Sequence, residues 1–353
     1  MEISVDRELL PENEHDRNEF LKKYFCELTV SAKEAPKGWV LSLGRPTSTE
    51  FYIDPGIVSG LDWWSKNYGK VDVAGIPFAH HRRPGMQLSL NDSWTIYSWS
   101  RWLKQSITHD MKSQAITLLH VDDHDDLMTP RIVNGGEAWV DSISGLALDL
   151  WLPETVASAV RSGAIGIGSF MSPLLHLFPS VNVRHLCSTE YSKDRQGAYS
   201  VRTLQKTDEL LAPGGLRPAL KLERVDNASD SSLDGGQGHP YIVTDDLIRW
   251  VADLPEGPIL IHIDMDYFNN RFNGDSNWVD DGPKYDPPLK DVLRRIDQLF
   301  YSLESEGVAE RVIDFAVALS PGFFPTDLWA PSIEMIQNHV NRLITAKRWT
   351  TRG

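Results

Sequence analysis

Cysteine, basic charge and long apolar runs are all scarce in this chain of 353 residues. With only two cysteines, Cys26 and Cys187, a disulfide framework is implausible and a reducing compartment is expected. No apolar run reaches the roughly 18 residues of a membrane-spanning helix, so no membrane partner is predicted. The N-terminus is acidic and lacks the basic and then apolar layout of an export signal, which favours a cytoplasmic protein.

Acidic residues outnumber basic ones by 49 to 35, which gives a formal net charge of −14 at pH 7. A chain this negative is a poor general binder of phosphate backbones, so nucleic acid is not an expected partner. The 12 tryptophans could stack on bases, but without a basic surface they fit a core or a cleft wall better. The same charge would attract a cationic ligand such as an arginyl side chain, although solubility alone also accounts for it.

Apolar runs typical of buried strands alternate with helical segments along most of the chain. The runs at 114–121, 163–171, 258–265 and 311–319 predict strands that are covered on both faces. Helices are predicted at 92–106, 153–162, 244–254, 287–306 and 332–347, and short strands within 37–53. This alternation predicts an α/β fold of three layers, with a mainly parallel central sheet flanked by helices. Residues 91–353 are expected to form the main domain, with residues 1–90 packed on it in a role that we do not assign.

Two of the predicted strands end in closely spaced acidic residues. The first runs into HVDDHDDLMTP at residues 120–130 and the second into IDMDYF at residues 263–268. Ligands of open α/β sheets bind beyond the carboxyl ends of the strands, which is where both motifs lie. In extended chain, side chains two residues apart share one side, which here groups Asp122, His124 and Asp126 in the first motif and Asp264 and Asp266 in the second.

Carboxylates that converge at the edge of a core repel one another unless a cation neutralises them. Four aspartates would balance two divalent ions and leave a neutral site that can hold a hydroxide. A majority of carboxylates with one imidazole suits a hard or borderline ion such as Mn²⁺. Neither cysteine lies near the motifs, which excludes a cysteine-rich zinc site. The residues therefore predict a metal site, with a solvated acidic rim as the alternative.

The pattern Asp-x-His-x-Asp-hydrophobic-x-Thr-Pro, followed far downstream by Asp-x-Asp, resembles the arginase/ureohydrolase superfamily. The two motifs are most similar to a branch that includes peptide arginases, which convert arginine to ornithine within ribosomally made peptides. The resemblance runs from about residue 90 to about residue 325, including Ser320-Pro321-Gly322. It implies an arginase-like fold and a manganese-dependent hydrolase with two Mn²⁺ per chain. An arginine-containing precursor peptide would be the substrate, and urea the second product.

Position by position, the resemblance implies that Asp122 and Asp264 each bridge both metal ions. His124 and Asp266 would complete the shell of one ion, and Asp126 would bind the other. His124 and Asp126 are the candidate catalytic residues, with Asp126 carrying a proton to the leaving amine. The second ion normally also takes a histidine from an upstream Gly-Gly-Asp-His-Ser turn. The counterpart here, SLNDS at residues 89–93, has no histidine, and Asp92 is the candidate substitute.

Met128 bears on the choice of substrate. In enzymes that act on free arginine this position is an asparagine that binds the carboxylate of the amino acid, and a thioether cannot donate such a hydrogen bond. A substrate whose carboxylate is tied up in a peptide bond would not need this contact, although Met128 could also be ordinary packing. Partners for the guanidinium group stay open among Glu137, Glu190 and Asp275.

Several histidines and other functions also stay open. His120 and His262, each two residues before the first Asp of a motif, could orient a metal ligand or be ordinary strand histidines. His176 or His185 could shuttle protons. A deacetylase of related fold with one Zn²⁺, or a ureohydrolase of free guanidino compounds, is an alternative within hydrolases. A non-catalytic binding module is the alternative from another class, and the intact set of mutually repelling acidic groups argues against it.

Overall fold

A mostly parallel sheet of nine strands forms the centre of the molecule in a computed structural model, which describes residues 1–106, 115–225, 238–274 and 286–350. The strand order is β12-β11-β13-β10-β6-β14-β15-β5-β4. The parallel strands are β5 (Met86–Ser89), β6 (Ile116–Val121), β10 (Val181–Leu186), β13 (Gly238–Thr244), β14 (Ile259–Asp264) and β15 (Val312–Ala318). The antiparallel strands lie at the edges: β4 (His80–Arg83), β11 (Gly197–Thr207) and β12 (Leu216–Arg224).

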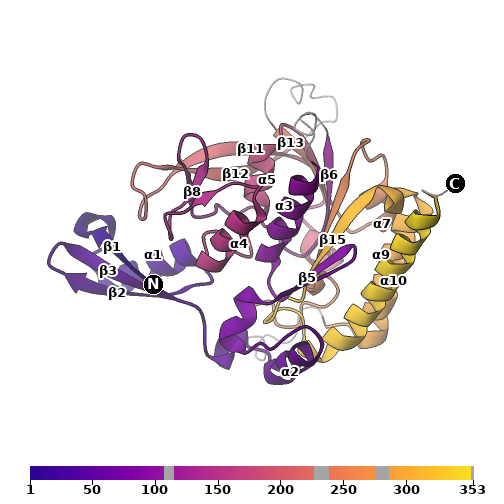
Figure 1. Ribbon diagram of the computed structural model, residues 1–353, viewed down its shortest axis with the longest axis horizontal. Helices are drawn as coiled ribbons and strands as arrows, with labels where there is room; N and C mark the ends of the chain where they lie inside the picture. Colours follow the sequence, from indigo (N-terminus) through magenta and orange to yellow (C-terminus); the bar gives the residue numbers. More distant parts are fainter. Residues whose placement is uncertain (107–114, 226–237, 275–285, 351–353) are drawn as a thin grey trace.

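Helices cover both faces of this sheet (Figure 1). One core contains α3 (Thr95–Gln105), α4 (Pro153–Ser162) and α5 (Met171–Leu177), which pack with strand residues such as Leu118 and Leu260. The other contains α2 (Ile57–Asn67), α7 (Leu247–Val251), α9 (Leu289–Ser305) and α10 (Trp329–Thr350), which pack with residues such as Leu119 and Ile261. Because successive strand side chains point to opposite faces, continuous apolar runs fill both cores. The expected α/β architecture with a mainly parallel central sheet is therefore confirmed.

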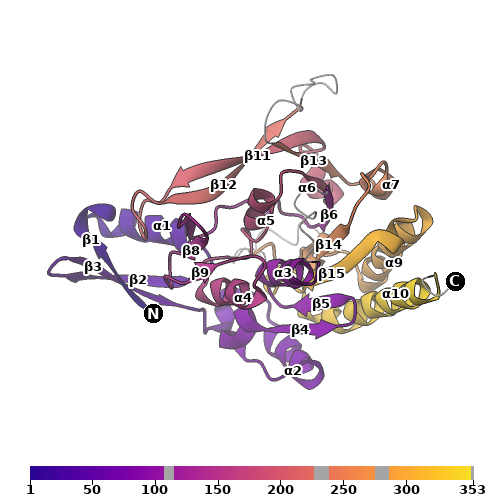
Figure 2. The same cartoon turned by 45° about the horizontal axis from the view of Figure 1, so that its top comes forward.

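Residues 1–44 form a separate small layer, called the N-terminal unit below. It consists of β1 (Glu2–Asp6), α1 (Glu14–Phe25), β2 (Thr29–Ala35) and β3 (Gly38–Gly44), with the antiparallel strand order β1-β3-β2. The unit projects from one end of the molecule, away from α9 and α10 (Figure 2). Strands β4 and β5 also precede residue 90 but belong to the central sheet, so that sheet includes residues on both sides of the expected domain boundary.

The prediction of a strand at residues 163–171 is wrong. Helix α4 is followed by Gly163 at a φ of +88°, a helix-ending conformation that favours glycine, and turns lead from there to α5. The other two glycines make room for side chains from distant segments. A Cβ atom at Gly166 would lie 1.6 Å from Glu27 Oε1, and one at Gly168 would lie 2.7 Å from Met128 Sδ. The sequence pattern missed three parallel strands, β5, β10 and β13; in β10, Asn182, Arg184 and His185 interrupt the apolar run.

The other predicted elements form at or near the expected places. The runs at 114–121, 258–265 and 311–319 are β6, β14 and β15, and four helices agree with α3, α4, α9 and α10. The helix expected at 244–254 is the shorter α7, which Asp246 caps by accepting from the backbone N–H groups of Ile248 and Arg249. The segment 37–53 contains β3 and a short 3-10 helix, Thr49–Tyr52. The structure also has a small antiparallel sheet of β7 (Ile132–Asn134), β8 (Trp139–Asp141) and β9 (Ala147–Leu148), and a short helix α6 (Thr189–Ser192).

Candidate metal centre

The two acidic motifs lie side by side because their strands are neighbours in the middle of the sheet. β6 and β14 pair in parallel, with His120 opposite His262. Asp122 follows the last residue of β6, and Asp264 is the last residue of β14. Both aspartates therefore stand at the carboxyl edge of the sheet, where open α/β sheets bind ligands.

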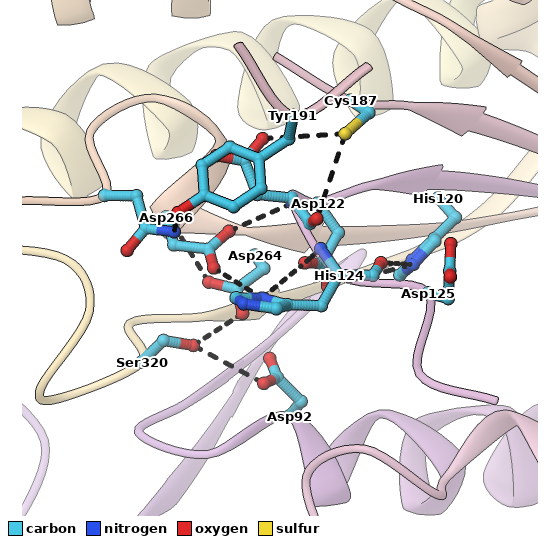
Figure 3. Close-up of polar contacts among 12 residues, drawn as sticks. Asp92, His120, Asp122, His124, Asp125, Cys187, Tyr191, Asp264, Asp266 and Ser320 are labelled. Atoms are coloured by element: carbon cyan, nitrogen blue, oxygen red, sulfur yellow. Dashed lines mark hydrogen bonds and ion pairs between the residues drawn. The ribbon is translucent and has the colours of Figure 1, made fainter. Parts of the chain in front are cut away.

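Hydrogen bonds connect the two motifs (Figure 3). Asp122 Oδ1 accepts from the His124 backbone N–H at 2.6 Å, and Asp264 Oδ1 accepts from the Asp266 N–H at 3.0 Å. Asp266 joins the motifs, because its Oδ1 accepts from the Asp123 N–H at 3.3 Å and its Oδ2 lies 2.9 Å from His124 Nδ1. Possible ligand atoms of Asp122, His124 and Asp266 all lie within 4.8 Å of one another.

A second group of possible ligands adjoins the first. Asp126 has a left-handed backbone, with a φ of +52°, a conformation that aspartate tolerates better than most residues. Ligand atoms of His120, Asp122, Asp126 and His262 lie within 4.8 Å of one another, and all four residues are buried. Asp122 belongs to both groups, so its carboxylate is placed where two cations could share it.

The two strand histidines are possible ligands that sequence reasoning did not assign to the metal. His120 Nδ1 lies 2.9 Å from His262 Nδ1, and His120 Nε2 lies 3.0 Å from the His124 carbonyl oxygen. The signal that could have identified them is the two-residue period, since His120 shares a strand side with Asp122, and His262 with Asp264.

Asp92, the expected substitute for the missing upstream histidine, lies beside His262. It follows β5, and its Oδ1 is 3.3 Å from His262 Nε2. Ser320, on the turn after β15, connects Asp92 to the second motif: its hydroxyl donates to Asp264 Oδ2 at 2.8 Å and lies 3.5 Å from Asp92 Oδ2. Of the residues proposed as metal ligands, the structure thus places Asp122, His124, Asp126 and Asp266 in the two groups, whereas Asp92 and Asp264 lie beside them and belong to neither.

Burial makes negative charge unfavourable in this cluster. Burial and then the charge of Asp266 raise the pKa of Asp122 to about 6. Burial, with the charges of Asp122 and Asp92, raises the pKa of Asp126 well above its usual value. The pKa of Asp264 is raised in the same direction, first by burial and then by Asp266. Without a cation, these carboxyl groups therefore keep their protons to a higher pH than free aspartates do.

Several buried carboxylate oxygens of the cluster lack a hydrogen-bond donor among the described residues. Asp122 Oδ2 and Asp126 Oδ2 are buried and accept no hydrogen bond there. Burial lowers the pKa of His124, but the charges and hydrogen bonds of Asp266 and Asp122 raise it overall, well above the usual range. Buried acceptors without donors destabilise a fold, and a divalent cation would satisfy them. The donor set of carboxylates with imidazoles fits a hard or borderline cation such as Mn²⁺.

His185 supports the cluster from the neighbouring strand β10. Its Nε2 lies 2.9 Å from the Asp122 carbonyl oxygen, and its Nδ1 lies 2.8 Å from the Tyr241 hydroxyl. Burial lowers the pKa of His185 to about 4, so the ring is neutral at pH 7 and positions the backbone of Asp122. His176, the other histidine considered as a proton shuttle, instead bonds the Ala219 carbonyl oxygen at 3.0 Å.

A cavity of about 710 Å³ opens onto the cluster. Its acidic lining consists of the carboxylates of Asp92, Asp125, Asp126, Asp264 and Asp266, together with that of Glu27. Its apolar lining includes Leu127, Met128, Ile167 and Phe323. The segment before residue 90 also contributes to this cavity, through Cys26, Glu27, Arg45, Tyr52, Ile53 and Pro77.

Glu27 is a carboxylate of this cavity that sequence reasoning missed. Its Oε2 accepts from the Ile167 N–H at 3.3 Å, and burial raises its pKa although Arg131 and Arg45 lower it. Of the three acidic residues considered as guanidinium partners, Glu137 and Glu190 are exposed and absent from the cavity lining, and Asp275 lies outside the described residues. Nothing in the local sequence marks Glu27, which stands in a short turn between α1 and β2.

No known protein-family model and no curated protein matches this chain.

In the part of the chain that the structure describes, every helix is too short or too polar to cross a membrane. Both cysteines are free, Cys26 half-buried and Cys187 buried.

Proposed function

We propose that this protein is a metal-dependent hydrolase that converts arginine residues of a peptide to ornithine and releases urea. The observation that carries the proposal is the buried cluster of aspartates, in which oxygens of Asp122 and Asp126 accept no hydrogen bond from the described residues, directly beside a cavity of about 710 Å³. That volume lies within the ~300–1,000 Å³ typical of small-molecule sites. We further propose an arginase-like fold, since both motifs of that superfamily stand at the ends of adjacent parallel strands.

Two Mn²⁺ ions are the proposed cofactor. Asp122, His124 and Asp266 would hold one ion, and Asp122 with Asp126 the other, while Asp92, Asp264 and His262 complete the donor set. Bound divalent cations supply a hydroxide nucleophile at neutral pH by lowering the pKa of water from 15.7 toward ~7. A guanidinium carbon is a poor electrophile for neutral water, which is why this chemistry needs such a nucleophile.

The chain's own residues would bind the substrate and move the proton. The acidic lining would attract the positive guanidinium group. Hydrolysis breaks the bond between the guanidinium carbon and the side-chain nitrogen, which leaves as an amine and takes up a proton. Asp126 is the proposed donor of that proton, because its carboxyl lines the cavity beside the other acidic groups of the cluster.

A peptide is the proposed substrate in preference to free arginine. Met128 lines the cavity with half of its surface exposed, at 50 %, so it is not a core packing residue. Its thioether offers no donor to a free carboxylate. Each of the two alternative hydrolase functions also has a supporting observation. For a deacetylase, Asp122, His124 and Asp266 alone would suffice to hold one Zn²⁺. For a ureohydrolase of free guanidino compounds, such a substrate would also fit the cavity.

The test incubates Mn²⁺-loaded protein with an arginine-containing peptide, free arginine, agmatine and an acetyl-lysine peptide. We expect a loss of about 42 Da per arginine in the first peptide, with one urea released for each. Deacetylation removes nearly the same mass, so urea must be measured as well. Asp264→Asn should abolish the reaction while the circular dichroism spectrum is retained. Release of acetate without urea, or urea from the free compounds only, would replace the proposal by the corresponding alternative.

A further inference from the structure

A second cavity of about 440 Å³ adjoins the metal cavity at the junction between the N-terminal unit and the main domain. The two cavities share four lining residues: Cys26, Glu27, Met128 and Gly168. Because they share these residues, the two cavities lie next to each other, the first at the metal centre and the second against α1. An arginine side chain alone would leave this second space empty.

The junction is held together by specific contacts. The Tyr24 hydroxyl bonds to Asp208 Oδ2 at 2.6 Å, and Arg131 Nε donates to the Tyr24 carbonyl oxygen at 2.8 Å. The guanidinium group of Arg217 stacks on the Tyr24 ring, 4.9 Å from its centroid. Glu27 is bonded to the backbone of Ile167 across the same junction. The wall that α1 contributes is therefore a fixed part of the cavity.

The second cavity has the opposite charge from the first. Four cationic side chains line it, namely Lys23, Arg131, Lys206 and Arg217, against two acidic ones, Glu27 and Glu209. The two arginines are buried and donate to backbone carbonyl groups, and Arg217 also forms an ion pair with Asp208 at 3.6 Å. Lys206 pairs with Glu209 at 3.9 Å. Lys23 is exposed on the last turn of α1 and forms no ion pair among the described residues. This positive lining stands out in a protein of net charge −14.

We propose that the second cavity binds a carboxylate of the substrate peptide that flanks the reactive arginine. The arginine side chain would enter the acidic cavity, the peptide chain would cross Met128 and Gly168, and the carboxylate would face Lys23. This inference rests on the proposed function and narrows its substrate to peptides with an acidic group near the arginine. The carboxylate has two possible sources, an Asp or Glu side chain and the free C-terminus of the peptide.

The test uses peptides that differ only next to the arginine. One set carries Glu, Gln or Lys at the flanking positions with an amidated C-terminus, and a second set has Gln with a free or an amidated C-terminus. Binding is measured by fluorescence anisotropy of labelled peptides, and turnover by urea release, so that recognition is read separately from chemistry. For the wild-type protein we expect roughly fivefold tighter binding of the Glu peptide than of the Lys peptide, the effect of one exposed ion pair.

Lys23→Glu should reverse that preference, and Lys23→Gln should remove it, with kcat for the Gln peptide changed less than KM. The matched control is Lys66→Glu, the same change at an exposed lysine of α2 that lines neither cavity. Equal binding of all peptides, or the same effect of Lys23→Glu and Lys66→Glu, would overturn the inference. If the preference holds but no peptide releases urea, the recognition site stands and the proposed reaction is the part that fails.

Discussion

Replacing Asp122 by asparagine should stabilise the protein when no metal is present, although this side chain is fully buried. Asparagine keeps the oxygen that accepts from the His124 N–H and removes a charge next to Asp266. Burial and Asp266 raise the pKa of Asp122 from 3.8 to about 6. The folded protein thus binds this proton more tightly than the unfolded chain does, and it loses stability as the pH rises from about 4 through about 6. Once the pH is above about 6, the wild type has lost up to about 3 kcal/mol of stability through this pKa shift, at 1.36 kcal/mol per pKa unit. The variant has no ionisable group at this position and avoids the loss.

The assay is urea unfolding at pH 8, first with a chelator and then with Mn²⁺. With chelator, the unfolding free energy of Asp122→Asn should exceed that of the wild type by up to about 3 kcal/mol, less whatever it costs to bury the new amide. With free Mn²⁺ at a hundred times its Kd, the wild type should gain about 2.7 kcal/mol and the variant much less. The difference in unfolding free energy between the two proteins should therefore shrink towards zero or change sign when metal is added.

Asp141 is the matched control because it is a buried aspartate with its hydrogen bonds satisfied. It accepts from the backbone N–H groups of Ile143 and Ser144 and from the hydroxyls of Ser144 and Ser162. Asp141→Asn should be destabilised by ~1–3 kcal/mol with and without metal. If Asp122→Asn behaves like Asp141→Asn in chelator and keeps the full gain with Mn²⁺, then Asp122 is a structural residue and the metal hypothesis is refuted.

Three further predictions follow from the same contacts. The unfolding free energy of the metal-free protein should fall as the pH rises from 6.5 to 8. Burial and Asp266 raise the pKa of Asp123 to about 8, so the folded state holds a proton that the unfolded chain releases. An unfolding free energy from urea titrations that stays flat or rises with pH would contradict this. His262→Gln should lower the Mn²⁺ content by about one ion per chain, measured by mass spectrometry of dialysed protein, whereas His239→Gln, at a buried histidine on β13, should leave it unchanged. Tyr24→Phe removes the 2.6 Å bond to Asp208 and should cost about 1 kcal/mol in stability, with faster proteolytic release of the N-terminal unit; unchanged proteolysis would show that this contact does not hold the unit.

The amino-acid sequence by itself determined the local elements and the chemistry at the strand ends. Helix α4 begins and ends as predicted, because Pro153 stands in its first turn and Gly163 takes the left-handed conformation after its last residue. The runs that became β6 and β14 are apolar on both faces, and the motifs that follow them contain the acidic residues of the site. These features depend on residues close together in the chain, so the pattern alone carries them.

The tertiary structure alone decided which distant segments complete the site. The motif resemblance already proposed Asp92 for the site, but its contact with His262, 170 residues away, was not predicted, and neither was the approach of Glu27 to the cavity from the N-terminal unit. The glycines at 166 and 168 looked like part of a strand, and only the tertiary structure shows that they leave room for the side chains of Glu27 and Met128. Periodicity tells which side of a strand a residue faces. Contacts between remote segments depend instead on how the layers pack, and no short stretch of the sequence determines that packing.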